Sequence, residues 1–146
     1  MRRGFLNFIP FPTRFPSLAD VASYIAAACR NAGIGDDVRL RAELVIEELF
    51  VNTVRHGHGG ECDHQVWIAA HGSADGLEIE YRDDAPAFDP LNTANADIER
   101  AIAERTIGGL GLHLVRSLSS RGRYRHADGL NCTTLFFAAD ATPRAL

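Results

Sequence analysis

The chain has 146 residues, of which 46% are hydrophobic and 23% are charged, and its formal net charge is −4. This composition is typical of one globular domain and excludes a largely disordered chain. The acidic balance argues against direct nucleic-acid binding, because a protein that holds the phosphate backbone needs a basic face.

The N-terminal apolar run predicts neither a signal peptide nor a membrane segment. It is interrupted by Asn7 and Pro10 and has no small-residue cleavage site, and no apolar stretch of the chain reaches the length of a membrane span. The three cysteines have no C-x-x-C spacing, which favours a reduced compartment. We therefore expect a cytoplasmic protein that makes no contact with membranes.

All fifteen residues counted as lysine or arginine are arginine. The absence of lysine excludes the P-loop lysine, the strand lysine of protein kinases and Schiff-base chemistry. Arg121, Arg123 and Arg125 alternate along one stretch and predict a solvent-exposed strand edge.

The N-terminal third predicts a strand and a helix. The apolar run Phe5 to Pro10 ends in proline and indicates an edge strand. Ser17 is the expected N-cap of a helix that runs to about Ala32, and the glycines at 33 and 35 end it.

A long central helix is predicted from Asp37 to Gly57. Apolar residues recur at three- and four-residue spacing, as a core-facing helix requires: Val38, Ala42, Val45, Ile46, Leu49 and Phe50. Glu48, Asn52 and His56 are spaced at i, i+4 and i+8 and therefore lie along one side of the helix. A carboxamide oxygen can hold Mg²⁺ while a carboxylate one turn away handles a proton. The alternative, in which both are ordinary helix-surface residues, stays open.

The second half of the chain predicts four more strands and one more helix. Val66 to Ala70 and Leu77 to Tyr81 alternate as two antiparallel strands, and Gly122 to His126 and Thr133 to Ala138 close the sheet. Between these pairs, the stretch after Leu91 is weakly patterned, with a short helix around Ile98 to Ala103. A glycine-rich stretch then opens a helix that runs through Leu118. Residues 1–146 are thus expected to form a single α+β domain, a two-layer sandwich with a mixed, mostly antiparallel sheet and helices on one face.

Two further features suggest a nucleotide. Glycines at 108, 109 and 111 open a helix, where free backbone amides favour a phosphate, although a plain tight turn is the alternative. Leu114 occupies the third glycine position of a dinucleotide motif, so a Rossmann site is excluded. Asp83 at a strand end could accept a hydrogen bond from the amine of adenine and repel the oxygen of guanine, or Asp83 or Asp84 could simply cap the turn.

Taken in order, these motifs give the chain a family resemblance. A Glu-x-x-x-Asn helix, an aspartate loop, a glycine-rich helix start and a closing Thr-Thr strand resemble the Bergerat-fold (GHKL) ATPases, the superfamily of gyrase, histidine kinases and MutL. The short build and the His56-Gly57 pair after Asn52 resemble the anti-sigma-factor serine kinases within it. The resemblance implies the Bergerat fold, with ATP and Mg²⁺ as cofactors.

The resemblance also implies a role for individual residues. Glu48 would be the general base and Asn52 the Mg²⁺ ligand, and Asp83 would bind adenine. Thr133 or Thr134 would close the pocket, and Arg105 lies about two residues from the family's lid arginine. The full set of implied ATP-binding residues is Asn52, Asp83, Gly109, Leu110, Gly111, Thr133, Thr134 and Arg105. The segment Asn92 to Ile107 would be a lid ordered by Mg²⁺-ATP.

The loop after Asp83 departs from the family pattern. Ala85 and Ala87, around Pro86, replace the glycines of the usual Asp-x-Gly-x-Gly sequence. Alanine is costly at positive φ, so this loop must either take a different course or bear strain.

A second group of residues has the composition of a metal site. It consists of His56, His58, Glu61, Cys62, Asp63 and His64. Zinc sites usually combine such a pair with a second pair of ligands elsewhere, and no such pair has a suitable spacing. Solvated loop residues are therefore the expectation.

The function that the resemblance implies is an anti-sigma-factor-like serine/threonine kinase that phosphorylates an antagonist protein and sequesters a sigma factor. A homodimer is left open. The first alternative is a non-catalytic interaction module that responds to nucleotide. The second is a detached catalytic domain of a histidine kinase, although the sequence shows no helical hairpin with a phosphoacceptor histidine.

Overall fold

The computed structural model describes residues 7–92 and 108–139. In chain order the elements are β1 (Ile9–Pro12), α1 (Ser17–Asn31), α2 (Asp36–Asn52), the π-helical turn η1 (Thr53–Gly57), β2 (Gln65–Ser73), β3 (Gly76–Asp83), α4 (Gly108–Leu118), β4 (Arg121–Ala127) and β5 (Leu130–Ala138). The predicted short helix at 98–103, Arg105 and nearly all of the predicted lid lie outside the described residues.

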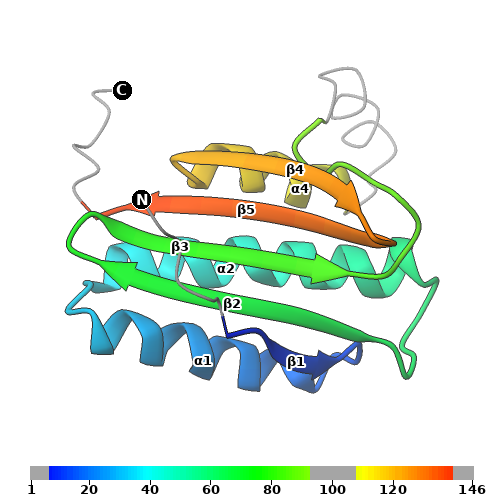
Figure 1. The fold of residues 1–146 in the computed structure, drawn as a ribbon, viewed down its shortest axis with the longest axis horizontal. Coiled ribbons are helices and arrows are strands. Elements are labelled where there is room, and N and C mark those ends of the chain that lie inside the picture. Colours follow the sequence, from blue (N-terminus) through cyan, green and yellow to red (C-terminus); the bar gives the residue numbers. More distant parts are fainter. Residues whose placement is uncertain (1–6, 93–107, 140–146) are drawn as a thin grey trace.

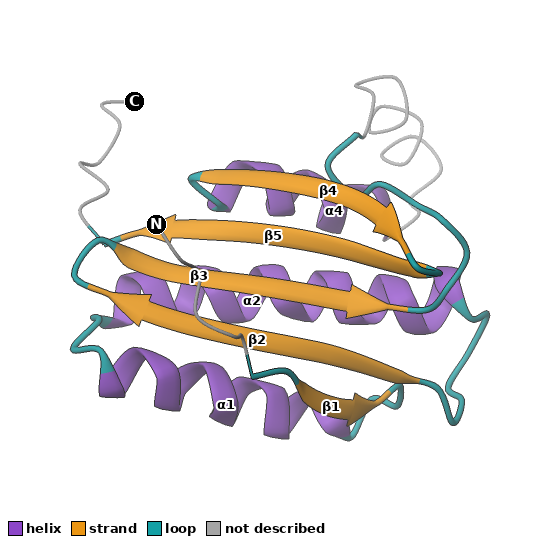
Figure 2. Ribbon diagram, viewed as in Figure 1, coloured by secondary structure: helices purple, strands orange, loops and turns teal. Residues whose placement is uncertain are grey.

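The strands form one sheet in the order β1-β2-β3-β5-β4, and every described pair is antiparallel. The helices α1, α2 and α4 lie together on one face of this sheet (Figure 1), with α2 between the other two (Figure 2). The predicted α+β fold with two layers and helices on one face is confirmed. The described sheet is antiparallel throughout, however, rather than mixed.

The core lies between the sheet and α2. All six apolar residues that the helical spacing assigned to the buried side of α2 are buried, and Ala42, Val45, Ile46 and Phe50 are fully inaccessible. They pack against strand residues that alternate along the sheet, such as Ile79 on β3 and Leu135 on β5. Each such side chain contributes roughly 1.5–3 kcal/mol of burial free energy. This packing fixes the orientation of α2 and therefore the side on which Glu48 and Asn52 lie.

The ends of several elements differ from the sequence predictions. The edge strand β1 begins at Ile9 and runs to Pro12, two residues beyond the predicted end. Ser17 is the first residue of α1 rather than its N-cap, because Pro16 takes the cap position and no side chain caps the helix. The central helix is α-helical only to Asn52, and its last turn is the π-helical η1.

Both edges of the sheet carry unusual residues. β1 contains Pro10 and Pro12 and pairs only with β2. At the other edge, Arg121, Arg123 and Arg125 of β4 are exposed, as their alternation predicted. The Arg121 guanidinium lies 4.1 Å from the centre of the Phe136 ring on β5. Among the helices in the described ranges, none is both long and apolar enough to cross a bilayer.

Candidate functional site

A cavity of about 240 Å³ opens where α2 ends beside the sheet. Three parts of the chain surround it: the last turns of α2 and η1, the facing ends of β3 and β5, and the loop that follows β3. Its lining residues are Leu49, Asn52, Thr53, His56, Gly57, Tyr81, Asp83, Ala85, Pro86, Ala87, Phe88, Pro90, Asn131 and Thr133.

Asp83 is the charged group at the base of this cavity. It ends β3, is only 8% exposed, and lies opposite Asn131 of β5 in the sheet register. Its Oδ2 accepts a hydrogen bond from the Thr53 hydroxyl at 2.8 Å. Its Oδ1 accepts from the Asn131 amide at 2.8 Å and from the Ala85 backbone N–H at 3.1 Å. A carboxylate has about four acceptor positions, so one position on Oδ2 is left for a ligand.

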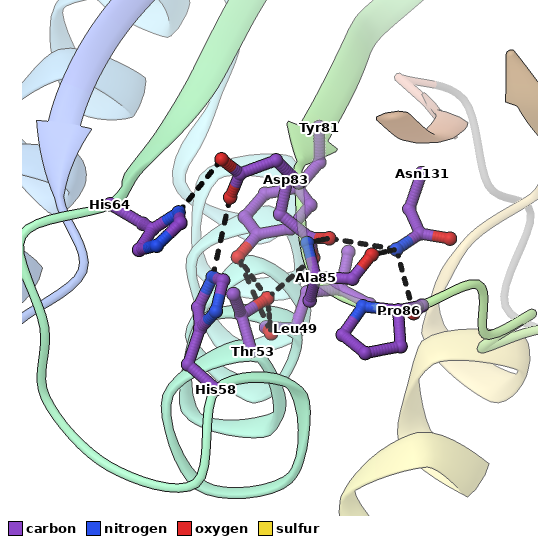
Figure 3. Close-up of polar contacts among 10 residues, drawn as sticks. Leu49, Thr53, His58, His64, Tyr81, Asp83, Ala85, Pro86 and Asn131 are labelled. Carbon is purple, nitrogen blue, oxygen red and sulfur yellow. Dashed lines mark hydrogen bonds and ion pairs between the residues drawn. The ribbon is translucent and has the colours of Figure 1, made fainter. Parts of the chain in front are cut away.

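Tyr81 sets the direction of the hydrogen bonds that lead to Asp83. Burial, and then the negative charge of Asp83, raise the pKa of Tyr81 well above its ordinary value, so its hydroxyl keeps the proton. The hydroxyl oxygens of Tyr81 and Thr53 are 2.6 Å apart. The Leu49 carbonyl accepts within reach of both hydroxyls, at 3.0 Å from Thr53 and 3.4 Å from Tyr81. When the single Thr53 proton is donated to Asp83, which can only accept, the tyrosine is the donor to Thr53. Figure 3 shows these side chains meeting at the end of β3.

Asn131 is a site residue that the sequence analysis missed. Besides Asp83, its amide donates to the carbonyls of Ala85 at 3.0 Å and Pro86 at 3.1 Å, and its Oδ1 accepts from the Phe88 N–H at 3.1 Å. Asn131 thus holds the whole loop from Asp83 to Phe88 in place. Strand alternation could have found it, because Asn131 and Thr133 are two residues apart on one strand and so share a face.

The loop after β3 takes a course of its own. Asp128 is the one non-glycine residue at positive φ among the described residues, so Ala85 and Ala87 have no strained backbone. Of the two outcomes that the missing glycines allowed, a different course is the one found. The Ala85 side chain is buried and faces Gly57, where an added Cβ would lie 2.8 Å from that of Ala85. Glycine is therefore needed at position 57, because position 85 carries a side chain where the family pattern has glycine.

This contact predicts a reciprocal pair of variants. Gly57→Ala is expected to destabilise the protein by about 1–3 kcal/mol, because two Cβ atoms cannot approach to 2.8 Å without moving the backbone. Adding Ala85→Gly should restore most of this loss. The measurement is the free energy of unfolding in urea for the wild type, both single variants and the double variant. Additive effects in this cycle would show that the two residues do not touch.

Glu48 lies beside the cavity, against the first turns of α4. An added Cβ at Gly111 would lie 1.9 Å from Oε2 of Glu48, so glycine at that position makes room for the carboxylate. Glu48 is not among the described residues that line the cavity. It lies one helical turn before Asn52 on α2 and packs against Gly111 near the start of α4.

The charge of Glu48 is disfavoured where it lies. Burial first, and then repulsion from Glu47, raise the pKa of Glu48 above the ordinary glutamate range, and Arg55 opposes the shift. The folded protein therefore binds this proton more tightly than the unfolded chain does. The free energy of unfolding consequently falls as the pH rises through the window between the two pKa values.

A stability measurement can check this sign. Glu48→Gln removes the carboxylate and should be more stable than the wild type at pH 7 but not at pH 4. The comparison requires urea unfolding at both pH values. Glu43→Gln is the control and should lose stability at pH 7, because Glu43 forms a salt bridge with Arg39 at 3.2 Å. A Glu48→Gln advantage that is equal at both pH values would refute the ionisation argument.

The structure separates the remaining predicted residues. Thr133 is buried and lines the cavity, whereas Thr134 points to the other face of the sheet and donates to Glu80 at 3.3 Å. α4 begins at Gly108 as predicted, which places the backbone of Gly109, Leu110 and Gly111 in its first turn. Arg105 lies outside the described residues. The structure thus groups Asn52, Asp83 and Thr133 around one cavity, and Thr134 does not reach it.

Comparison with known proteins identifies a family for this chain and two similar proteins. Residues 11–137 match the family described as histidine kinase-like ATPase domain. The serine-protein kinase RsbW of Listeria innocua is 26% identical over 129 residues, which are 84% of this chain and 80% of that protein. The solved structure of the histidine kinase AdeS of Acinetobacter baumannii is similar with a TM-score of 0.46 at 16% identity, covering 94% of this chain and 70% of that one. The resemblance seen in the motifs is confirmed, and the family match spans most of the residues: the chain belongs to the histidine kinase-like ATPase domain family.

Proposed function

We propose that this protein binds Mg²⁺-ATP and acts as an anti-sigma-factor-like kinase. It would transfer the γ-phosphoryl group to a serine or threonine of an antagonist protein, and in its other state sequester a sigma factor. A homodimer would be compatible with this role, and we expect the protein to act in the cytoplasm. The serine-protein kinase RsbW, at 26% identity, supports this class of function.

The observation that carries the nucleotide proposal is the state of Asp83. A buried carboxylate whose donors leave one acceptor position open toward a cavity is suited to the exocyclic amine of adenine. The cavity of about 240 Å³ is below the roughly 300–1,000 Å³ of sites for whole drug-sized ligands. It would therefore take the base, and the phosphates would extend toward the start of α4, where backbone amides favour anions.

The remaining residues fit the triphosphate end. The carboxamide oxygen of Asn52 is a ligand type that Mg²⁺ accepts, and Asn52 lines the cavity together with Asp83, one helical turn beyond Glu48. When bound, the metal would neutralise charge on the phosphates. Glu48, whose raised pKa brings it closer to working pH, would orient the attacking hydroxyl and accept its proton. Thr133 would close the pocket beside the base.

One observation favours a second candidate. Glu48 packs against Gly111 and does not line the described cavity. This position is the one expected in a module that binds nucleotide without transferring phosphate. In that case nucleotide would act only as a conformational ligand for partner binding.

Titration separates these candidates. The full chain is titrated calorimetrically with ATP and GTP, with and without Mg²⁺, and then assayed for radiolabel transfer to candidate antagonist proteins. The kinase proposal expects binding of ATP over GTP, Mg²⁺ dependence and transfer. Tight ATP binding without transfer to any candidate would favour the non-catalytic module, and equal affinity for ATP and GTP would remove Asp83 as the residue that selects the base.

A further inference from the structure

Two histidines and an aspartate gather beside the cavity, on the side away from Asn131. His58 follows η1, His64 precedes β2, and Asp84 follows β3. One ligand atom from each lies within 4.8 Å of the others. The two imidazole rings stack with centres 4.7 Å apart and planes at 28°. Figure 3 shows both rings joined by dashed lines to the carboxylate between them.

The sequence predicted a solvated loop here, and the structure divides that loop in two. Glu61 accepts the Phe15 backbone N–H, and Asp63 pairs with Arg14 at the surface. The two histidines instead face Asp84. The spacing in the sequence did not indicate this contact, because Asp84 is twenty residues beyond His64.

One distance within the group matches tetrahedral metal coordination. His64 Nδ1 lies 2.8 Å from Asp84 Oδ2, and His58 Nε2 lies 3.4 Å from Asp84 Oδ1. With zinc–nitrogen and zinc–oxygen bonds of about 2.0–2.1 Å, a 3.4 Å separation subtends an angle of about 110° at the metal, which is the tetrahedral value. His64 Nδ1, which forms a hydrogen bond with Asp84 Oδ2, would exchange that contact for a bond to the metal.

Two atoms of the group are buried without a hydrogen-bond partner among the described residues. They are His58 Nε2 and Asp84 Oδ1. The His58 side chain is only 10% exposed, so water reaches it poorly. Although the two atoms face each other at 3.4 Å, their geometry does not make a hydrogen bond. Buried polar atoms of native proteins are nearly always satisfied, and one shared cation would satisfy both.

The backbone already holds the ligands in position. Gly59 and Gly60, which lie between the two histidines, have φ of +75° and +149°. Residues other than glycine rarely adopt these backbone angles. The His58 N–H donates to the Thr53 carbonyl at 2.9 Å, and the His64 carbonyl accepts from the Thr13 N–H at 3.0 Å. Little ordering would remain for a metal to impose.

We propose that His58, His64 and Asp84 bind a zinc-class divalent transition-metal ion, with water in the remaining position. Two imidazole nitrogens and one carboxylate suit zinc, whereas Mg²⁺ prefers oxygen ligands, so this site is separate from the one proposed at Asn52. The ion would tie the turn after Gly57 to the chain after Asp83, and both of those residues line the cavity. The site does not depend on nucleotide binding.

The test uses the untagged full chain, stripped with EDTA and free of nucleotide. Zn²⁺ is titrated against a chromogenic chelator, and Co²⁺ is added separately as a spectroscopic probe. We expect one Zn²⁺ per chain and the intense visible absorption of tetrahedral Co²⁺. His64→Ala and Asp84→Asn should each weaken Zn²⁺ binding by about 100-fold or more, because loss of a ligand exceeds the 10- to 100-fold cost of losing an outer partner.

His71→Ala is the matched control, because it removes an exposed histidine seven residues along β2 from His64, about 23 Å by the rise of a strand. It should bind Zn²⁺ like the wild type. His64 is 55% exposed, so its variant should fold, and equal melting temperatures in EDTA would verify this. Wild-type binding no tighter than that of His64→Ala, or affinity unchanged in both ligand variants, would overturn the proposal.

Discussion

Glu48→Gln is expected to lower phosphoryl transfer to an antagonist protein by roughly 10²- to 10⁴-fold, the usual contribution of a general base. The amide keeps the shape of the carboxylate, so it still fits against Gly111, where an added Cβ would lie 1.9 Å from Oε2 of Glu48. ATP affinity should therefore persist. The measurement is single-turnover radiolabel transfer, run beside calorimetry of ATP binding on the same preparation.

Two matched variants on the same helix make this result specific. Glu47→Gln removes the neighbouring charge that helps raise the pKa of Glu48, and it should keep most of the transfer rate. Asn52→Ala should instead weaken the Mg²⁺-dependent part of ATP binding, because a carboxamide oxygen is a metal ligand and not a proton acceptor. A Glu48→Gln protein that no longer binds nucleotide would return this residue to a structural role in α2.

Asp83→Asn is expected to cost about 1.5–3 kcal/mol of ATP affinity, the range for a hydrogen bond to a charged group. The corresponding loss for GTP should be much smaller, because the guanine oxygen gains nothing from a carboxylate. Selectivity for ATP over GTP is therefore the decisive quantity, measured by calorimetry with both nucleotides.

The polar network around Asp83 makes a control necessary. The same carboxylate accepts from Thr53, Asn131 and Ala85, and an asparagine would turn an N–H₂ group toward one of these donors. Asp84→Asn, measured without zinc, removes the same charge one residue further on and should leave selectivity unchanged. If Asp83→Asn lowers the melting temperature and weakens ATP and GTP equally, Asp83 is a structural residue and not the one that selects the base.

Periodicity predicted much of the fold because burial is periodic. The six apolar positions of α2 and the alternation along β2 and β3 follow from which face meets the core. The structure buries these positions, apart from Ala70, which is partly buried. The same rule could have distinguished Thr133 from Thr134. Thr133 shares the parity of buried Leu135 and Phe137, so it faces the helices, while Thr134 pairs with Glu80 on the opposite face.

Other parts of the site depend on contacts that no local pattern encodes. The π-helical turn at Thr53–Gly57 is a shift of backbone hydrogen bonds, with the His58 N–H reaching the Thr53 carbonyl. The fit of Gly57 against Ala85 and of Gly111 against Glu48 joins segments far apart in the chain. The order of motifs predicted the family, but the course of the loop after Asp83 required the position of Asn131.

The residues at the two edges of the sheet affect the tendency of this protein to aggregate at high concentration. Open strand edges can add a strand from another molecule and seed aggregates. Proline at two positions of β1 removes backbone donors, and the three exposed arginines of β4 would bring like charges together if two such edges met. Within the described part of the chain, self-association through continuous sheets is thereby disfavoured at both ends, and concentrated solutions should stay free of fibrils.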